Sequence, residues 1–231
     1  MATFVLIPGA GGDAREWSGL VAELESRGHE AIAVALPAGD DAAGWKEYAD
    51  TVVRAIGDRT GVILVAQSLA GFTAPLVCER VPVDLLVLLN AMIPEPGETG
   101  EAWWSNAGWN AAATEYRASI GLSERDADDD HVIYFHDVPK DVLEDYLAGP
   151  EPAQSWTPMT QPWPLDAWPD VPTRVVAGRD DRLFPATMQQ RVARERLGIE
   201  ADLIDGGHMV AMSRPRELAD RLESYRREFD G

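Results

Sequence analysis

The sequence has little cysteine and no long apolar run. Its 231 residues include one cysteine, Cys78, so no internal disulfide bond can form. Cys78 stands in an apolar stretch with helical character, where a free thiol usually behaves as a small buried hydrophobe. The apolar runs are too short for a signal peptide or a membrane-spanning helix. From these features we expect a cytoplasmic protein that has no membrane partner.

Positive charge is also scarce. Lysine and arginine total 20 against 39 acidic residues, which gives a net charge of −19, and the lysines are only Lys46 and Lys140. The negative electrostatic field of this charge repels the phosphate backbone of nucleic acids and anionic lipids. We therefore expect no nucleic-acid partner. The acidic run at residues 126–130 is most simply a solvated loop, because no ligand spacing accompanies it. We therefore expect no metal site.

Short apolar runs alternate with helical patterns over most of the chain. Helical spacing follows the first run up to Gly28, covers residues 41–56, and returns at residues 186–197 and 215–229. Continuous apolar runs separated by helices are typical of a parallel sheet with helices on both faces. We therefore expect an α/β fold with a mostly parallel sheet of about six strands. The expected strands are residues 3–7, 31–36, 61–67, 85–89, 173–178 and 201–204.

This alternation breaks between residues 93 and 166, which are rich in proline, glycine, tryptophan and acidic residues. Helical pieces are expected near residues 111–120 and 140–147. Linkers rarely carry so many aromatic residues, so we interpret this segment as an inserted helical cap. The chain is then a single domain, with a core formed by residues 1–92 and 167–231. Trp103 and Trp104 in the cap are equally well explained as pocket lining or as cap packing.

Ser68 stands between a buried strand and a segment of small residues that opens a helix. Ala66 and Ala70 flank it two residues away on each side. This is the layout of a nucleophile elbow, a sharp turn that lifts one hydroxyl above a sheet, although the usual flanking residues are glycines. A helix N-cap would explain the same serine. The stretch alone does not decide between the two roles.

A serine nucleophile needs a base, and the base needs an acid to orient it. Of the four histidines, only His208 lies in a loop directly after a late core strand. The acid is expected after the penultimate strand, where Asp181 has the better spacing and Asp180 is the nearest rival. Asn90 follows an earlier strand, but an amide cannot stabilise an imidazolium ion. The other histidines are His29, in a turn, and His131 and His136, in the cap.

Acyl transfer also needs hydrogen-bond donors for the oxyanion. One candidate is the amide of Leu69, directly after Ser68 and at the start of a helix. The other is the amide of Ala10, beside Gly9 in the loop after the first strand. Glycine-rich loops also bind phosphates, but this one has neither the G-x-G-x-x-G pattern nor the lysine of a P-loop. We therefore expect no nucleotide and no other cofactor.

The chain order Ser68, Asp181, His208, with the loop at Gly9 and a cap between, resembles the α/β-hydrolase family. Residues 134–139 and 207–213 resemble the branch that contains plant methylesterases and hydroxynitrile lyases. The resemblance implies an α/β-hydrolase fold with Ser68 as nucleophile, His208 as base and Asp181 as its orienting acid. It also implies the amides of Ala10 and Leu69 as oxyanion donors. The departures are Pro8 in place of the usual histidine, and Ala66 and Ala70 in place of the elbow glycines.

The branch contains two chemistries, and two positions separate them. The lyases place lysine after the catalytic histidine and threonine at the position of Gly9, whereas this sequence has Met209 and Gly9, as in the esterases. We therefore expect a cofactor-free serine carboxylesterase for small or medium apolar esters. Its pocket would include Gly9, Trp103, Trp104 and Met209. The alternatives are a ligand-binding or signalling protein with little turnover and a cofactor-free lyase or oxygenase. A homodimer is compatible with each of these functions.

Overall fold

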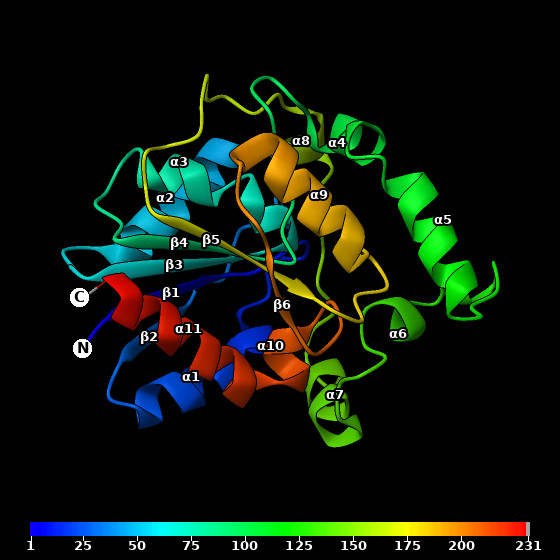
Figure 1. Cartoon of the computed structure of the whole chain (residues 1–231). Helices are drawn as coiled ribbons and strands as arrows, with labels where there is room; N and C mark the ends of the chain where they lie inside the picture. Colours follow the sequence, from blue (N-terminus) through cyan, green and yellow to red (C-terminus); the bar gives the residue numbers. More distant parts are fainter. Residues whose placement is uncertain (230–231) are drawn as a thin grey trace.

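The computed structural model describes residues 1–229, and six strands within them form one sheet (Figure 1). The strand order is β2-β1-β3-β4-β5-β6, and every neighbouring pair is parallel. The expected α/β fold with a parallel six-stranded sheet is therefore confirmed. The strands are β1 (Thr3–Ile7), β2 (Glu30–Ala33), β3 (Val62–Gln67), β4 (Leu85–Leu89), β5 (Thr173–Gly178) and β6 (Asp202–Ile204).

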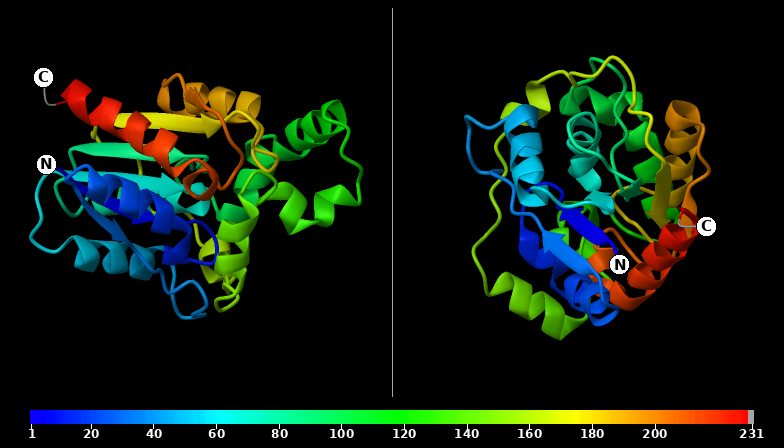
Figure 2. Two further views of the ribbon diagram at one scale, coloured as in Figure 1. Left: turned by 90° about the horizontal axis from the view of Figure 1, so that it is seen from below. Right: turned by 90° about the vertical axis from the view of Figure 1, so that its left-hand side faces the viewer.

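The central strands carry side chains that are buried on both faces of the sheet. Every residue of β1, β3 and β4 is buried, which is why these strands are continuous apolar runs. Helices α1 (Ser18–Ser26) and α11 (Pro215–Phe229) cover one face (Figures 1 and 2). The opposite face is covered by α2 (Trp45–Ile56), α3 (Ala74–Cys78) and α9 (Ala186–Leu197).

The topology brings two loops together at one edge of the sheet. Strand β1 lies between β2 and β3, with Ile7 in register with Ala66, so the loops that leave β1 and β3 start side by side. In open parallel sheets, ligands bind outside the carboxyl ends of the strands at such a reversal of strand order. The Gly9 loop and Ser68 both lie at this point.

The segment between β4 and β5 is mostly helical. It contains α4 (Gly100–Asn106), α5 (Trp109–Ser119), α6 (Asp130–Ile133), α7 (Lys140–Leu147) and α8 (Thr157–Thr160). Helices α5, α6 and α7 lie beyond the carboxyl ends of the strands (Figures 1 and 2).

Tryptophans attach this segment to the core by their indole N–H groups. Trp109 donates to the Leu183 carbonyl at 2.7 Å, and Trp163 donates to the Phe72 carbonyl at 3.0 Å. These hydrogen bonds, added to the burial of large rings, explain the high tryptophan content of the segment.

Five expected elements change their bounds, the smallest change being that β3 begins at residue 62 and not at residue 61. The strand expected at 31–36 ends at Ala33, because the Leu36 amide donates to the Gly12 carbonyl at 3.0 Å and not to the sheet. The helix expected at 41–56 begins at Trp45, because Asp40 forms a turn that accepts the Ala43 amide at 3.0 Å. The helix expected at 111–120 is α5, and the strand expected at 201–204 is β6, one residue shorter. Among residues 1–229, no helix combines the length and apolarity that a bilayer crossing needs.

Candidate active site

Ser68 lies in a sharp turn at the carboxyl end of β3. It opens a short 3₁₀ helix, η2 (Ser68–Gly71), and its φ angle of +52° is unusual for a residue other than glycine. The Met92 amide donates to the Ser68 carbonyl at 2.9 Å and holds the turn in place. A methyl group at Gly71 would lie 1.7 Å from the Met92 carbonyl oxygen, so only glycine fits there. The elbow geometry therefore forms although Ala66 and Ala70 occupy the flanking positions.

The Gly9 loop packs directly against this serine. A methyl group at Gly9 would lie 2.9 Å from Ser68 Cβ and 3.5 Å from Ser68 Oγ, so the loop can approach only because Gly9 has no side chain. Ala10 follows in the same loop, and Leu69 follows Ser68 in the first turn of η2, where amides lack intrahelical partners. Both residues line the cavity that contains Ser68. Their positions suit the oxyanion role expected from the sequence.

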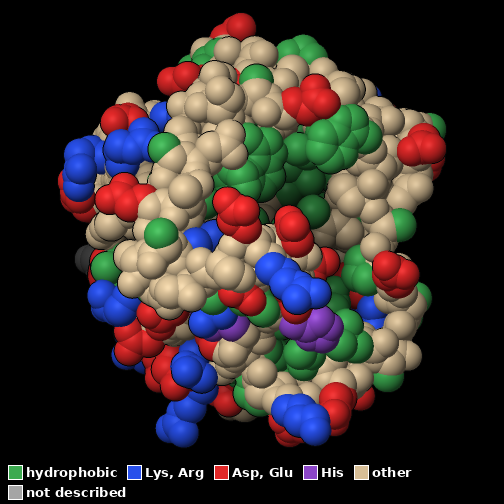
Figure 3. Space-filling model, turned by 90° about the vertical axis from the view of Figure 1, so that its right-hand side faces the viewer, with side chains coloured by type: hydrophobic (Ala, Val, Ile, Leu, Met, Phe, Trp, Pro, Cys, Tyr) green, Lys and Arg blue, Asp and Glu red, His purple; other side chains and the backbone are tan. Residues whose placement is uncertain are grey.

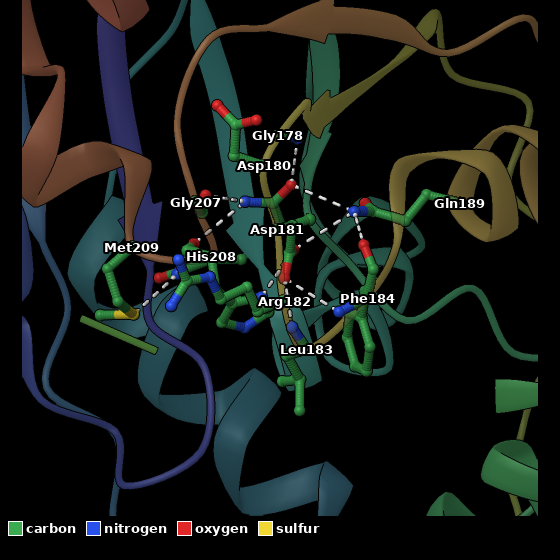
Figure 4. A network of polar contacts seen from close by, with 12 residues as sticks. Gly178, Asp180, Asp181, Arg182, Leu183, Phe184, Gln189, Gly207, His208 and Met209 are labelled. Atoms are coloured by element: carbon green, nitrogen blue, oxygen red, sulfur yellow. Dashed lines mark hydrogen bonds and ion pairs between the residues drawn. The ribbon is translucent and has the colours of Figure 1, made fainter. Parts of the chain in front are cut away.

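His208 and Asp181 form a buried pair (Figure 4). The distance from His208 Nδ1 to Asp181 Oδ2 is 2.8 Å. The other oxygen, Asp181 Oδ1, accepts the amides of Leu183 at 2.8 Å and Phe184 at 2.9 Å. Because Nδ1 donates to the carboxylate, Nε2 of the imidazole keeps the lone pair that a general base needs. Asp180, the rival acid, is exposed and does not contact His208 through its side chain.

Amide side chains fix the main chain of His208. Its carbonyl accepts Gln67 Nε2 at 3.0 Å and Asn90 Nδ2 at 3.0 Å. Asn90 Oδ1 accepts the Gly178 amide at 2.6 Å, which joins the loop that carries His208 to the strand that precedes Asp181. Gln189 Nε2 lies 3.3 Å from both Asn90 Oδ1 and Asp181 Oδ2.

The sequence reasoning missed these three amides as site residues. Asn90 was considered only as an acid, although its position directly after β4 was a signal that it faces this edge. Gln67 directly precedes Ser68, and this position is also a signal. Gln189 lies in the middle of α9 and carried no signal, because only the tertiary fold turns it toward Asp181.

The inserted segment also holds the histidine loop. Asp137 Oδ2 accepts the Gly207 amide at 2.9 Å, and the ring of Tyr134 meets the His208 ring edge to face at 5.6 Å. His136 Nε2 lies 3.0 Å from the Asp180 carbonyl oxygen, so its N–H donates there, and burial lowers its pKa. His136 and Asp137 thus link the segment to both loops of the acid–base pair.

A cavity of about 620 Å³ lies over Ser68 and His208. Its wall includes Gly9, Trp104 and Met209, as the sequence predicted. Trp103 does not line it: this side chain is fully buried, packs against Phe184 at a ring distance of 5.1 Å, and donates to the Ile93 carbonyl. The lining interpretation therefore fits Trp104, and the packing interpretation fits Trp103. The face beyond the strand ends has a hollow with hydrophobic side chains and acidic groups at its edge (Figure 3).

Two other candidate groups lie apart from this site. His29 forms an ion pair with Glu223 at 2.5 Å, and neither lines the cavity. Burial raises the pKa of Cys78 to about 12, so its thiol stays protonated and is a poor nucleophile.

Solved structures with this fold cover nearly the whole chain. Polyneuridine aldehyde esterase is 19% identical, with a TM-score of 0.77 over 97% of this chain and 99% of that one. A pyrethroid hydrolase from Sphingobium faniae is 19% identical, with a TM-score of 0.74 over 98% and 97%. An extracellular hydrolase from a Paenibacillus species, described as homologous to tobacco salicylic acid binding protein 2, is 20% identical, with a TM-score of 0.74 over 97% and 98%.

At these identities the likeness is one of fold, and no curated protein sequence matches the chain significantly. The resemblance to the plant methylesterase branch therefore stays a prediction, to which these neighbours add a shared fold. The family model described as the alpha/beta hydrolase family matches residues 4–221. The chain therefore belongs to the alpha/beta hydrolase family.

Proposed function

We propose that the protein is a serine carboxylesterase that needs no cofactor and acts on small or medium apolar esters. The observation that carries the proposal is the position of Ser68 in a positive-φ turn, in the same cavity wall as a histidine paired with a buried aspartate. Family membership and the esterases and hydrolases among the structural neighbours support hydrolysis as the reaction class.

The substrate class follows from the cavity wall. Its side chains are mostly apolar or aromatic, and they include Leu69, Met92, Trp104, Phe135, Met159, Leu183 and Phe184. A volume of about 620 Å³ suits a small or medium molecule. The net charge of −19 favours an uncharged ester and helps to expel the anionic acid that hydrolysis releases.

In the proposed mechanism, His208 Nε2 takes the Ser68 hydroxyl proton as the serine oxygen attacks the ester carbonyl carbon. The amides of Ala10 and Leu69 bind the oxyanion. The bond to the alcohol oxygen then breaks, and His208 returns the proton to the leaving alcohol. Water, deprotonated by His208, then attacks the acyl-enzyme. The bond between the acyl carbon and Ser68 Oγ breaks, His208 returns the proton to Ser68, and the carboxylic acid is released. Asp181 stabilises the imidazolium ion of His208 in both halves of the reaction, acylation and deacylation.

Hydrolysis of p-nitrophenyl esters of increasing acyl length tests this proposal. We expect turnover by the native protein and a loss of several orders of magnitude in Ser68→Ala, with an optimum length that reflects the cavity. Equal rates in both proteins would contradict it. Tight ester binding without turnover would favour a binding or signalling role, and release of a carbonyl compound without an acid product would favour a lyase.

A further inference from the structure

A second polar group faces the cavity beside the catalytic loop. Glu16 lies in a 3₁₀ turn, η1 (Ala14–Trp17), which follows the Gly9 loop. Its side chain lines the same cavity as Ser68, yet the residue is only 4% exposed. Among residues 1–229, no group forms a hydrogen bond with Glu16 Oε1. A residue of the cavity wall thus carries a buried carboxyl oxygen that has no partner from the described chain.

The neighbouring cation does not neutralise Glu16. The Arg15 guanidinium binds the Asp13 carboxylate and the carbonyls of Tyr146 and Pro150, and it is turned away from Glu16. Burial raises the pKa of Glu16 to about 8, against the opposing effect of the Gly9 amide. At neutral pH the group is therefore a carboxylic acid, which both donates and accepts a hydrogen bond.

Tyr146, on α7, is a second hydroxyl-bearing residue of the cavity wall. Burial raises the pKa of Tyr146 to about 12, and the nearby Glu16 carboxylate raises it further. Arg15 stacks on the Tyr146 ring at 4.9 Å and fixes its position. The wall thus contains two neutral hydroxyl-bearing groups, Glu16 and Tyr146, together with the packed rings of Trp104 and Phe184.

A buried polar group without a hydrogen bond costs free energy, and a molecule bound in the cavity can supply the partner that Glu16 lacks. We infer that Glu16 is a specificity residue that binds a neutral hydroxyl group on the substrate. The preferred esters then carry a hydroxyl group away from the reacting carbonyl. This inference specifies the substrate class of the proposed esterase site, and it therefore rests on the proposed function.

The test measures binding, so that it does not depend on turnover. The background is Ser68→Ala, alone and combined with Glu16→Leu or Glu16→Gln. The ligands are butyl butanoate and two hydroxylated analogues, one with the hydroxyl at the end of the butyl group and one with it on the acyl chain. Titration calorimetry gives the dissociation constant of each ligand with each protein.

We expect one hydroxylated ester to bind Ser68→Ala about tenfold more tightly than butyl butanoate, the size of one net hydrogen bond. Glu16→Leu should reduce this preference to less than about twofold, and Glu16→Gln should retain part of it, because an amide still donates and accepts. The analogue that binds more tightly than butyl butanoate shows whether the alcohol side or the acyl side of the ester lies against Glu16.

Equal binding of the three esters to Ser68→Ala would overturn the inference, and so would a preference that survives Glu16→Leu. A failure to bind any of them would also overturn it. The proposed function is tested separately, because hydrolysis of butyl butanoate by the native protein does not involve the hydroxyl group. Turnover of butyl butanoate without a preference for hydroxylated esters would contradict only the inference about Glu16. A preference for a hydroxylated ester without any turnover would contradict only the proposed esterase function.

Discussion

Asn90 holds His208 by its main chain. Its side-chain amide donates hydrogen bonds to the Gly207 carbonyl at 3.1 Å and to the His208 carbonyl at 3.0 Å, although the residue never meets the imidazole ring. Asn90 itself has a φ angle of +46° and is fully buried. A side chain directly after β4 thus fixes a loop that lies more than a hundred residues later in the chain.

Replacing Asn90 by aspartate should therefore impair turnover more than binding. The carboxylate cannot donate, and it faces two carbonyl oxygens, so two hydrogen bonds of about 1 kcal/mol each are lost. We expect kcat on a p-nitrophenyl ester to fall roughly 30-fold, with KM changed less than about threefold. Asn110→Asp adds the same charge at an exposed position of α5 and should leave both constants unchanged. A rise in KM with kcat unchanged would argue against a positioning role.

The two neighbouring aspartates should differ sharply. Asp181 is fully buried and accepts His208 Nδ1, whereas Asp180 is exposed. Asp181→Asn should lower kcat by about 10³- to 10⁴-fold, because an amide favours the wrong histidine tautomer. Asp180→Asn should stay within about twofold of the native rate. Comparable losses in both variants would show that His208 is not oriented by Asp181.

The sequence was sufficient for those features that depend on local pattern. Buried strands such as β1 and β4 are continuous apolar runs, and Ser68, Asp181 and His208 each follow a strand. Parallel strands end at one edge, so chain order alone places such residues together. The boundaries failed where side chains compete with regular structure, as in the Asp40 turn before α2.

The remaining parts of the site depend on long-range packing. Gln189 reaches Asp181 only because α9 packs on the sheet, and Glu16 faces the cavity only because η1 and the inserted segment close over it. Trp103 and Trp104 are adjacent in sequence, yet a helix turns one into the core and the other toward the cavity. A single sequence contains no periodic signal for these choices.

The two adjacent tryptophans offer a direct contrast. Trp103→Ala removes a fully buried ring and should lower the free energy of unfolding by about 3–5 kcal/mol. Trp104→Ala should cost less stability, since this side chain is partly exposed, but it enlarges the cavity and should move the best acyl chain to a greater length. Urea unfolding and the p-nitrophenyl ester series measure the two effects. An unchanged length optimum in Trp104→Ala would mean that the acyl chain lies elsewhere.

Glu16 should make stability depend on pH. Its pKa rises from an ordinary value of 4.5 to about 8 in the folded protein, because burial disfavours the charged form. Below pH 4.5 the Glu16 carboxyl is protonated in both the folded and the unfolded protein. Between pH 4.5 and about pH 8 it stays protonated only in the folded protein. The contribution of Glu16 to the free energy of unfolding is therefore greatest at low pH and is lost as pH rises through this window. The loss is about 1.4 kcal/mol per pH unit and on the order of 5 kcal/mol in all.

Urea unfolding between pH 5 and pH 9 measures this dependence, with Glu16→Gln as the variant that cannot titrate. The difference in unfolding free energy between the variant and the native protein should shift in favour of the variant as pH rises. Glu25→Gln, at an exposed position of α1, should follow the native curve. Parallel curves for the native protein and Glu16→Gln would mean that Glu16 is ionised in the folded state.

The central claim is that Ser68 forms a covalent acyl-enzyme, and mass spectrometry after rapid quenching with p-nitrophenyl acetate tests it most directly. The account predicts a burst of p-nitrophenol equal to the enzyme concentration, with one acetyl group on the peptide that contains Ser68. Ser68→Ala should show neither. Steady turnover by the native protein, with no acetyl group on Ser68 at any time, would contradict the account.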